Sequence, residues 1–156
     1  MRTVFLGLIG STWLFVASAY AQEQLAADLD SANAESFKVF DADADGKATP
    51  AEIIAGAKTV FTALDANSDG AADEGEFQVF SMGYEPLAQQ LIRGAEYKAA
   101  RTAIFTRWDM NGDKQLSEAE IATSLLAETM SAANASVDLP AYATAQFIAE
   151  MGASLK

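Results

Sequence analysis

The chain has 156 residues, of which 10 are basic and 22 acidic, so its net charge is −12, and it contains neither histidine nor cysteine. The missing residue types exclude disulfides, zinc sites built on thiolate or imidazole, and every catalytic triad or dyad that uses histidine. The negative charge repels nucleic acid and anionic lipid and attracts cations. The length suits one compact domain or two small lobes.

The first 21 residues have the pattern of a secretory signal peptide. A short basic head at 1–3 precedes an apolar run over 4–16, and residues 19–21 (A-Y-A) have the small-x-small form of a signal-peptidase site. We therefore expect cleavage after Ala21 and a periplasmic or secreted protein with 9 basic and 22 acidic residues, a net charge of −13. A retained membrane anchor is the alternative, although the apolar run is short for a bilayer.

Two twelve-residue units follow one pattern, D-A-D-A-D-G-K-A-T-P-A-E at 41–52 and D-A-N-S-D-G-A-A-D-E-G-E at 65–76. A hard cation such as Ca²⁺ takes about six to eight oxygen ligands, and this spacing lets one turn supply most of them. The first unit offers Asp41, Asp43, Asp45, the Lys47 carbonyl, Thr49 and Glu52. The second unit offers Asp65, Asn67, Asp69, the Ala71 carbonyl, Asp73 and Glu76. Glycine at position 6 of both units permits the left-handed backbone that the turn needs.

A third unit, D-M-N-G-D-K-Q-L-S-E-A-E, occupies 109–120. Its candidate ligands are Asp109, Asn111, Asp113, the Gln115 carbonyl, Ser117 and Glu120. Lys114 stands at position 6, where left-handed geometry costs a side chain about 1–2 kcal/mol, and Gly112 is expected to share the distortion. Three acidic ligands, against four in each earlier unit, predict the weakest of the three sites.

Residues 134–145 repeat the pattern incompletely. Oxygen-bearing side chains recur at positions 1, 3 and 5, but Leu139 replaces the glycine and Ala145 stands where glutamate should close the site. We interpret the segment as a fourth loop that has lost its metal. The alternative is an ordinary turn between two helices.

The segments around the loops have helical periodicity, so the predicted fold class is all-α, with helix–loop–helix repeats divided into halves at 22–83 and 84–156. Expected helices cover 22–32, 34–40, 53–64, 74–82, 87–108, 121–132 and 140–153. The helix over 53–64 is shared by the first two loops and is about 18 Å long. If it is straight, those loops lie at its opposite ends and cannot pair. The basic cluster of Arg93, Lys98, Arg101 and Arg107 is interpreted as a solvated helix face, with an anion site as the alternative. Pairing of some of these side chains with the acidic loops is also open.

These motifs resemble the EF-hand superfamily over 37–132, and the resemblance implies helix–loop–helix units that bind calcium. The signal peptide, the 24-residue step between the first two loops and the segment I-I-A-G-A-K-T-V-F-T-A-L are also similar to the lanmodulins, periplasmic EF-hand proteins that bind lanthanides. Lanmodulin loops typically have proline at position 2, where this chain has Ala42, Ala66 and Met110. Aspartate at position 9 occurs only as Asp73.

We therefore expect a non-enzymatic protein that binds up to three calcium ions and acts as a buffer or a calcium-dependent switch. One alternative is lanthanide binding of the lanmodulin kind, and another is an adaptor that docks on a periplasmic or extracellular protein when calcium is bound. No nucleic-acid partner is expected, and no membrane partner after signal cleavage. Catalysis is disfavoured because the clustered carboxylates are all assigned as metal ligands and no nucleophile–base pair is present.

Overall fold

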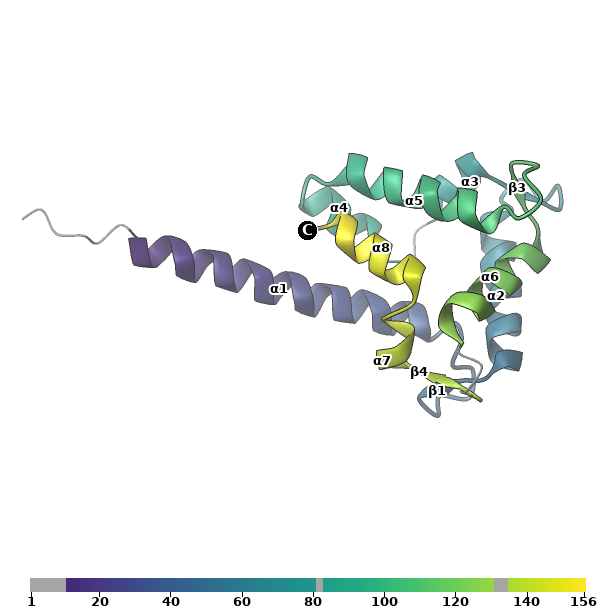
Figure 1. The fold of residues 1–156 in the computed structure, drawn as a ribbon, viewed down its shortest axis with the longest axis horizontal. Coiled ribbons are helices and arrows are strands. Elements are labelled where there is room, and N and C mark those ends of the chain that lie inside the picture. The colour runs from purple at the N-terminus through teal and green to yellow at the C-terminus, as the bar shows by residue number, and fades with distance from the viewer. Residues whose placement is uncertain (1–10, 81–82, 131–134) are drawn as a thin grey trace, which may run out of the picture.

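The computed structural model describes residues 11–80, 83–130 and 135–156 (Figure 1). Helices dominate this part of the chain and its only strands are two residues long, so the predicted all-α class is confirmed. The elements in chain order are α1 (Ser11–Phe37), β1 (Lys47–Ala48), α2 (Pro50–Leu64), β2 (Ala72–Asp73), α3 (Glu74–Val79), α4 (Glu85–Gln90), α5 (Gly94–Trp108), β3 (Gln115–Leu116), α6 (Glu118–Thr129), β4 (Val137–Asp138), α7 (Leu139–Tyr142) and α8 (Gln146–Ser154).

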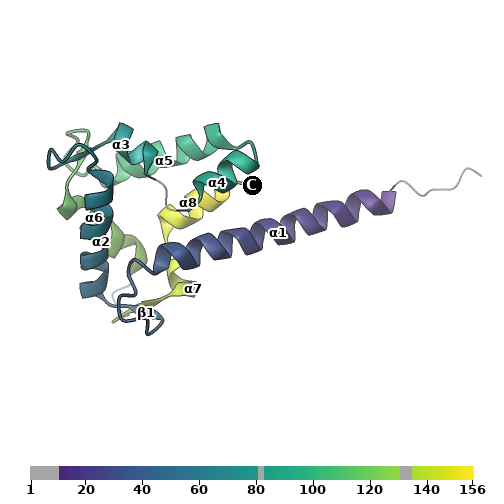
Figure 2. The same cartoon turned by 180° about the vertical axis from the view of Figure 1, so that it is seen from behind.

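Helix α1 is long, and its N-terminal part projects from the remaining elements (Figures 1 and 2). It includes all of the helix expected over 22–32 and most of the one expected over 34–40, and it runs through the predicted cleavage point after Ala21. Its C-terminal part is held by two buried hydrogen bonds, from the Tyr84 hydroxyl to Asn33 and between the hydroxyls of Ser36 and Tyr142. Within the described residues, no helix combines the length and apolar character needed to span a membrane.

Helix α2 connects the first two loops, as predicted. It begins with a Thr49–Glu52 capping box and with proline at its first position, two features that favour a helix start at this point. Its buried face packs against α6, and the two helices lie together at one side of the molecule, between β3 and the β1–β4 pair (Figure 1). Gly56 is needed there because a Cβ at this position would collide with the Phe40 ring and lie 2.9 Å from the Val39 carbonyl oxygen. The first and second loops lie at opposite ends of α2 (Figure 1).

The short strands pair in a nested order, the first with the fourth and the second with the third. Strand β1 of the first loop pairs with β4 near the C-terminus, with Lys47 opposite Asp138 and Ala48 opposite Val137. Strand β2 of the second loop pairs with β3 of the third, with Ala72 opposite Leu116. Both pairs are antiparallel. Each strand pair therefore joins one loop from residues 22–83 to one loop from residues 84–156.

Two predicted helices are each divided into two. The helix expected over 87–108 is interrupted between α4 and α5, where Ile92 has a φ of 57° and Gly94 begins α5. The helix expected over 140–153 is interrupted between α7 and α8, where Ala143 ends the short first part and Ala145 caps the second. Helical periodicity continues through both breaks, so the apolar pattern alone does not reveal them.

The core is rich in aromatic side chains, which link the two strand pairs. Trp108 is 2 % exposed and makes edge-on contacts with Phe77 of α3 and Phe147 of α8. Phe147 in turn contacts Tyr142 of α7, which packs on Phe37 of α1. Elements adjacent to all four loops thus share one continuous core.

The interpretation of the basic cluster as a solvated face is wrong for two of its members. Arg101 is 4 % exposed. Arg107 forms ion pairs with Glu128 at 3.0 Å and Glu150 at 2.9 Å, both on neighbouring helices rather than in the loops. Burial lowers the pKa of Arg107, but its hydrogen bonds to the two carboxylates outweigh burial and raise the pKa overall.

Candidate metal centres

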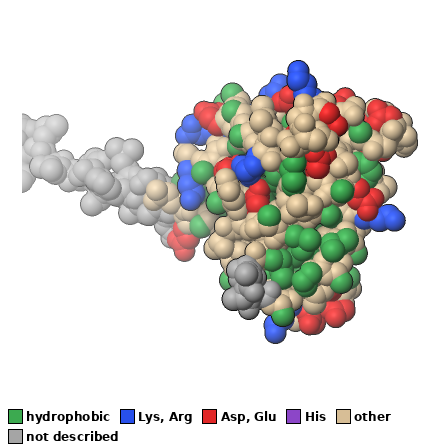
Figure 3. Space-filling model, turned by 45° about the vertical axis from the view of Figure 1, so that its right-hand side comes forward, with side chains coloured by type: hydrophobic (Ala, Val, Ile, Leu, Met, Phe, Trp, Pro, Cys, Tyr) green, Lys and Arg blue, Asp and Glu red, His purple; other side chains and the backbone are tan. Residues whose placement is uncertain are grey.

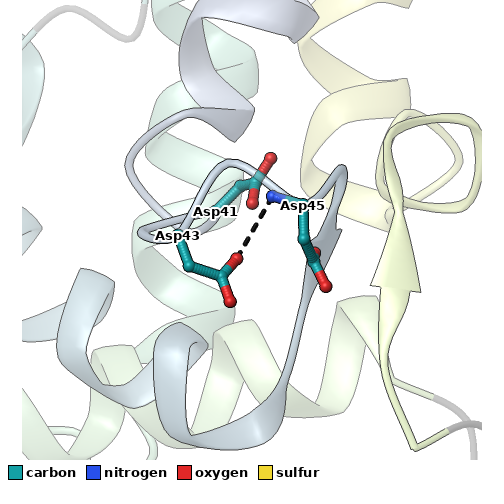
Figure 4. A group of neighbouring side chains, drawn as sticks. All are labelled: Asp41, Asp43 and Asp45. Carbon is teal, nitrogen blue, oxygen red and sulfur yellow. Dashed lines mark hydrogen bonds between the residues drawn. The ribbon is translucent and has the colours of Figure 1, made fainter.

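The first loop gathers three carboxylates on one tight turn between α1 and α2 (Figure 4). Asp41, Asp43 and Asp45 each place a carboxylate oxygen within 4.8 Å of the other two. Oxygen Oδ2 of Asp41 accepts a hydrogen bond from the Gly46 N–H at 3.1 Å, but its Oδ1 is buried and has no donor among the described residues. Like charges at this separation repel each other, and a buried anionic oxygen without a donor is costly. A bound cation would relieve both effects.

All three loops share one framework of backbone hydrogen bonds to the candidate ligands. The carboxylate at position 1 accepts from the N–H at position 6, the oxygen at position 3 from position 5, and the carboxylate at position 5 from position 7. The distances for position 1 are Asp41–Gly46 3.1 Å, Asp65–Gly70 3.0 Å and Asp109–Lys114 2.9 Å. Those for position 3 are Asp43–Asp45 3.2 Å, Asn67–Asp69 2.8 Å and Asn111–Asp113 2.8 Å. Those for position 5 are Asp45–Lys47 2.8 Å, Asp69–Ala71 3.1 Å and Asp113–Gln115 2.9 Å. The side chains predicted at these positions are therefore brought together in each loop.

The glutamate at position 12 reaches back over the beginning of its own loop in all three cases. Its Oε1 accepts a hydrogen bond from a backbone N–H at position 2 or 3. The pairs are Glu52–Ala42 at 3.2 Å, Glu76–Asn67 at 3.1 Å, Glu120–Met110 at 3.1 Å and Glu120–Asn111 at 3.3 Å. The carboxylate that the sequence predicts to close each site is thus already placed beside the other candidate ligands.

Position 9 connects each loop to the helix that leaves it. Thr49, Asp73 and Ser117 cap α2, α3 and α6, and each exchanges hydrogen bonds with the glutamate three residues later. Hydrogen bonds from the Thr49 backbone and side chain lower the pKa of Glu52. Burial raises the pKa of Glu120, but its bonds to the Ser117 backbone and side chain outweigh burial and lower it. Both carboxylates are therefore anionic at neutral pH, as ligands for a divalent cation must be.

The left-handed backbone occurs at positions 4 and 6 of every loop, and the loops differ in which position holds glycine. In the first two loops glycine is at position 6, and position 4 holds Ala44 and Ser68, both with a φ of 58°. The third loop reverses this, with Gly112 at position 4 (φ 75°) and Lys114 at position 6 (φ 66°). The predicted distortion at Lys114 and Gly112 is confirmed. Each loop nevertheless contains one strained non-glycine residue, so Lys114 does not distinguish the third loop from the others.

The register of β4 against β1 defines which C-terminal residues are equivalent to a loop, here called the fourth loop. Val137 pairs with Ala48, which is at position 8 of the first loop. Asp138 caps α7 by accepting the Ala141 N–H at 3.0 Å, the task of position 9 in the other loops. The equivalent segment is therefore 130–141, four residues earlier than the 134–145 that the sequence analysis proposed, although residues 131–134 lie outside the described structure. In this register Ala141, not Ala145, occupies the position of the closing glutamate.

Sequence reasoning missed the residues that pair the loops. Position 8 is apolar and at most 1 % exposed in each case: Ala48, Ala72, Leu116 and Val137. An apolar residue before a capping side chain recurs four times in the sequence and could have revealed both the pairing and the register of the fourth loop.

A scan of family models, a search of curated proteins and a search of solved structures each gave no match to this chain.

Proposed function

We propose that this chain is a calcium-binding protein of the EF-hand type with three metal loops, working as a calcium-dependent switch or buffer in the periplasm or outside the cell. The observation that carries the proposal is the loop framework that recurs three times: the side-chain oxygens at positions 1, 3 and 5 accept the same backbone hydrogen bonds, and the glutamate at position 12 reaches back over the start of its own loop. Oxygen-rich ligand sets of this kind suit hard cations such as Ca²⁺. No thiolate or imidazole is available for a softer metal, since the chain contains no cysteine or histidine.

The ligands would be the side chains at positions 1, 3, 5, 9 and 12 of each loop and the carbonyl at position 7. The bound cation supplies positive charge at the point where these anionic side chains converge. Three divalent ions would bring the charge of residues 22–156 from −13 to about −7. On the face shown in Figure 3, acidic and basic side chains are interspersed and an apolar patch occupies the lower right. Neutralising the loops would reduce the repulsion among the acidic side chains that each loop brings together.

The paired loops provide a route from metal binding to the helices. The glutamate at position 12 lies in the first turn of the helix that leaves each loop. Residues at position 8 connect one loop to another. Ordering one loop would consequently order its partner strand and the start of its leaving helix, which couples binding to folding. At a ligand concentration of one hundred times Kd, a single site would add about 2.7 kcal/mol of stability.

Calorimetric titration of purified residues 22–156 with Ca²⁺, Mg²⁺ and a lanthanide tests the proposal. We expect three calcium ions per chain, and two after any one of the substitutions Glu52→Gln, Glu76→Gln or Glu120→Gln. Glu118→Gln serves as the matched control because Glu118 is exposed on the first turn of α6, two residues before Glu120. No heat and no change in melting temperature with any of these ions would reject the proposal. Retention of three sites in Glu120→Gln would reject the assignment of the third loop.

A further inference from the structure

A cleft of about 840 Å³ lies between α1 and α8 (Figure 1). Leu25 and Leu29, one turn apart on α1, line one side, and Ile148 and Gly152 of α8 line the other. A Cβ added at Gly152 would meet no atom within 4 Å, so the space over this part of α8 is open. All the described lining residues lie within 22–156, so the cleft belongs to the chain that is expected after signal cleavage.

The size and the walls of this cleft suit a small molecule. Pockets that bind small molecules measure about 300–1,000 Å³, and most have apolar walls with a few polar groups that orient the ligand. Leu25 and Leu29 are only half-buried. A ligand with an apolar body would remove their remaining apolar surface from water, which favours its binding.

One buried polar side chain lines the cleft and can orient a ligand. Asn33 is 8 % exposed and lies beside Tyr84. Burial raises the pKa of Tyr84, so its hydroxyl stays protonated and donates a hydrogen bond to the Oδ1 atom of Asn33. The Nδ2 atom of Asn33 has no hydrogen-bond partner among the described residues, yet it retains accessible surface. Its two hydrogens are therefore available to an acceptor in the cleft.

The charges around the cleft favour an uncharged acceptor. Asp30 and Lys156 are the charged side chains among its described lining residues, one of each sign, and both are exposed. The net charge of −13 on residues 22–156 disfavours a bound anion. An ammonium group has no lone pair with which to accept from the Asn33 amide. An uncharged carbonyl oxygen meets both conditions.

We propose that the cleft between α1 and α8 binds an uncharged small molecule that has an apolar body and a carbonyl oxygen. The apolar body packs between Leu25 and Leu29 on one side and Ile148 on the other. The carbonyl oxygen accepts a hydrogen bond from the Asn33 amide. The site is separate from the proposed calcium loops, because no candidate metal ligand is among the lining residues that the structure describes.

Fluorescence titration of residues 22–156 with Nile red, without metal, tests this site. Nile red is an uncharged dye with an apolar ring system and a carbonyl oxygen, and we expect a saturable rise in emission at one dye per chain. Gly152→Leu places a side chain in the open space of the cleft and should weaken binding about tenfold or more. Ala153→Leu is the matched control because Ala153 is exposed on the same helix and is not among the lining residues, so the midpoint should stay unchanged. Equal midpoints in the wild-type protein and in Gly152→Leu would overturn the proposal.

Asn33→Asp tests the hydrogen bond to the ligand. It keeps an oxygen for the Tyr84 hydroxyl but replaces the amide donor with an acceptor, so the dye should bind about tenfold more weakly. The wild-type protein provides a second measurement if this variant fails to fold. The side-chain amide signals of Asn33 in heteronuclear NMR should then shift with the same midpoint as the emission. Amide signals that stay in place at saturating dye would overturn the assignment of Asn33.

A second copy of the chain could fill the cleft instead of a small molecule. Loss of the emission rise at protein concentrations where the chain dimerises would assign the cleft to that contact and overturn the small-molecule site. Because the titrations are made without metal, none of these results depends on whether the loops bind calcium.

Discussion

The two loop pairs have the same strand register but differ in their candidate ligands. In the pair formed by the second and third loops, both members have a complete set of oxygen ligands closed by Glu76 and Glu120. In the other pair the first loop is complete, whereas its partner has Ala141 at the closing position. The features common to both pairs are the apolar residue at position 8 and the cap at position 9, and a complete set of candidate metal ligands is not one of them.

This difference shows that a loop can pair its strand and cap its helix without a complete set of candidate metal ligands. The fourth loop still provides Val137 to pair with Ala48 and Asp138 to begin α7. It therefore pairs with the first loop although it has no carboxylate at the closing position. Two ions are expected to bind at one end of the α2–α6 pair and one ion at the other.

The largest loss of stability is expected from replacing Glu128, which connects α6 to α5 and α8. Its side chain is 10 % exposed and accepts hydrogen bonds from the Trp108 indole at 2.7 Å, from the Phe147 N–H at 2.7 Å and from Arg107. Glu128→Ala leaves the Trp108 indole N–H and the Phe147 N–H without this acceptor, while Arg107 keeps its ion pair with Glu150, so we expect a loss of about 2–6 kcal/mol in the free energy of unfolding. Urea unfolding without metal measures the loss.

Glu118→Ala on the same helix is the control for this substitution, and its effect should be small because the side chain is exposed. If Glu128→Ala lowers the free energy of unfolding by less than about 1 kcal/mol, contacts other than those of Glu128 hold α6 against α5 and α8.

Shortening the apolar residue at position 8 should affect one loop pair at a time. Leu116 is fully buried, and Leu116→Ala should reduce the free energy of unfolding by about 2–5 kcal/mol. Val137→Ala removes two methyl groups at the equivalent position and should cost about 2 kcal/mol. Calcium titration of each variant should show weaker binding in the second and third loops for Leu116→Ala and in the first loop for Val137→Ala. The same change at all sites in both variants would contradict independent pairs.

Much of the local structure was predictable because it depends on short-range rules. The capping boxes, the shared helix α2 and the left-handed backbone at Lys114 follow from residue types at fixed spacing. The strain at Ala44 and Ser68 was not predicted, since neither residue is a typical left-handed one.

The long-range arrangement was not predictable from spacing alone. The breaks at Ile92 and Ala143 interrupt segments with continuous helical periodicity, and the one local signal for a bend was Gly94, which begins α5 just after the first break. Burial of Arg101 likewise depends on Phe77, which is 24 residues away and belongs to another helix. The register of the fourth loop was predicted wrongly because the polar residues at 134–138 resemble the first residues of a loop. The pairing of Val137 with Ala48 instead assigns Val137 to position 8.

Replacing one closing glutamate tests whether the second and third sites are coupled to each other and whether the first site binds its ion independently. Loss of a group that supports metal binding typically reduces affinity by about 10–100-fold, so we expect at least the lower value at the mutated site. Glu76→Gln should also weaken the third site through β2–β3, whereas Glu52→Gln should leave the second and third sites unchanged. Trp108 is buried next to the third loop and is the only tryptophan in residues 22–156, so its emission reports that site. An emission midpoint that shifts equally in both variants would argue against the pairing.

The smallest effect on stability is expected from adding or removing one non-glycine residue with a left-handed backbone in a loop. A Cβ added at Gly112 would meet no atom within 4 Å, so Gly112→Ala introduces backbone strain without a collision. With Lys114 already left-handed, the third loop would then hold two strained residues, and we expect a loss of about 1 kcal/mol in the free energy of unfolding. Ala44→Gly removes the strained residue of the first loop, but it gives the unfolded chain more freedom, so its net gain should stay below about 1 kcal/mol. Urea unfolding without metal measures whether the free energy of unfolding falls in Gly112→Ala and rises in Ala44→Gly. A destabilising Ala44→Gly together with a neutral Gly112→Ala would mean that side chains at position 4 stabilise the turn, and the equivalence of the three loops would then fail.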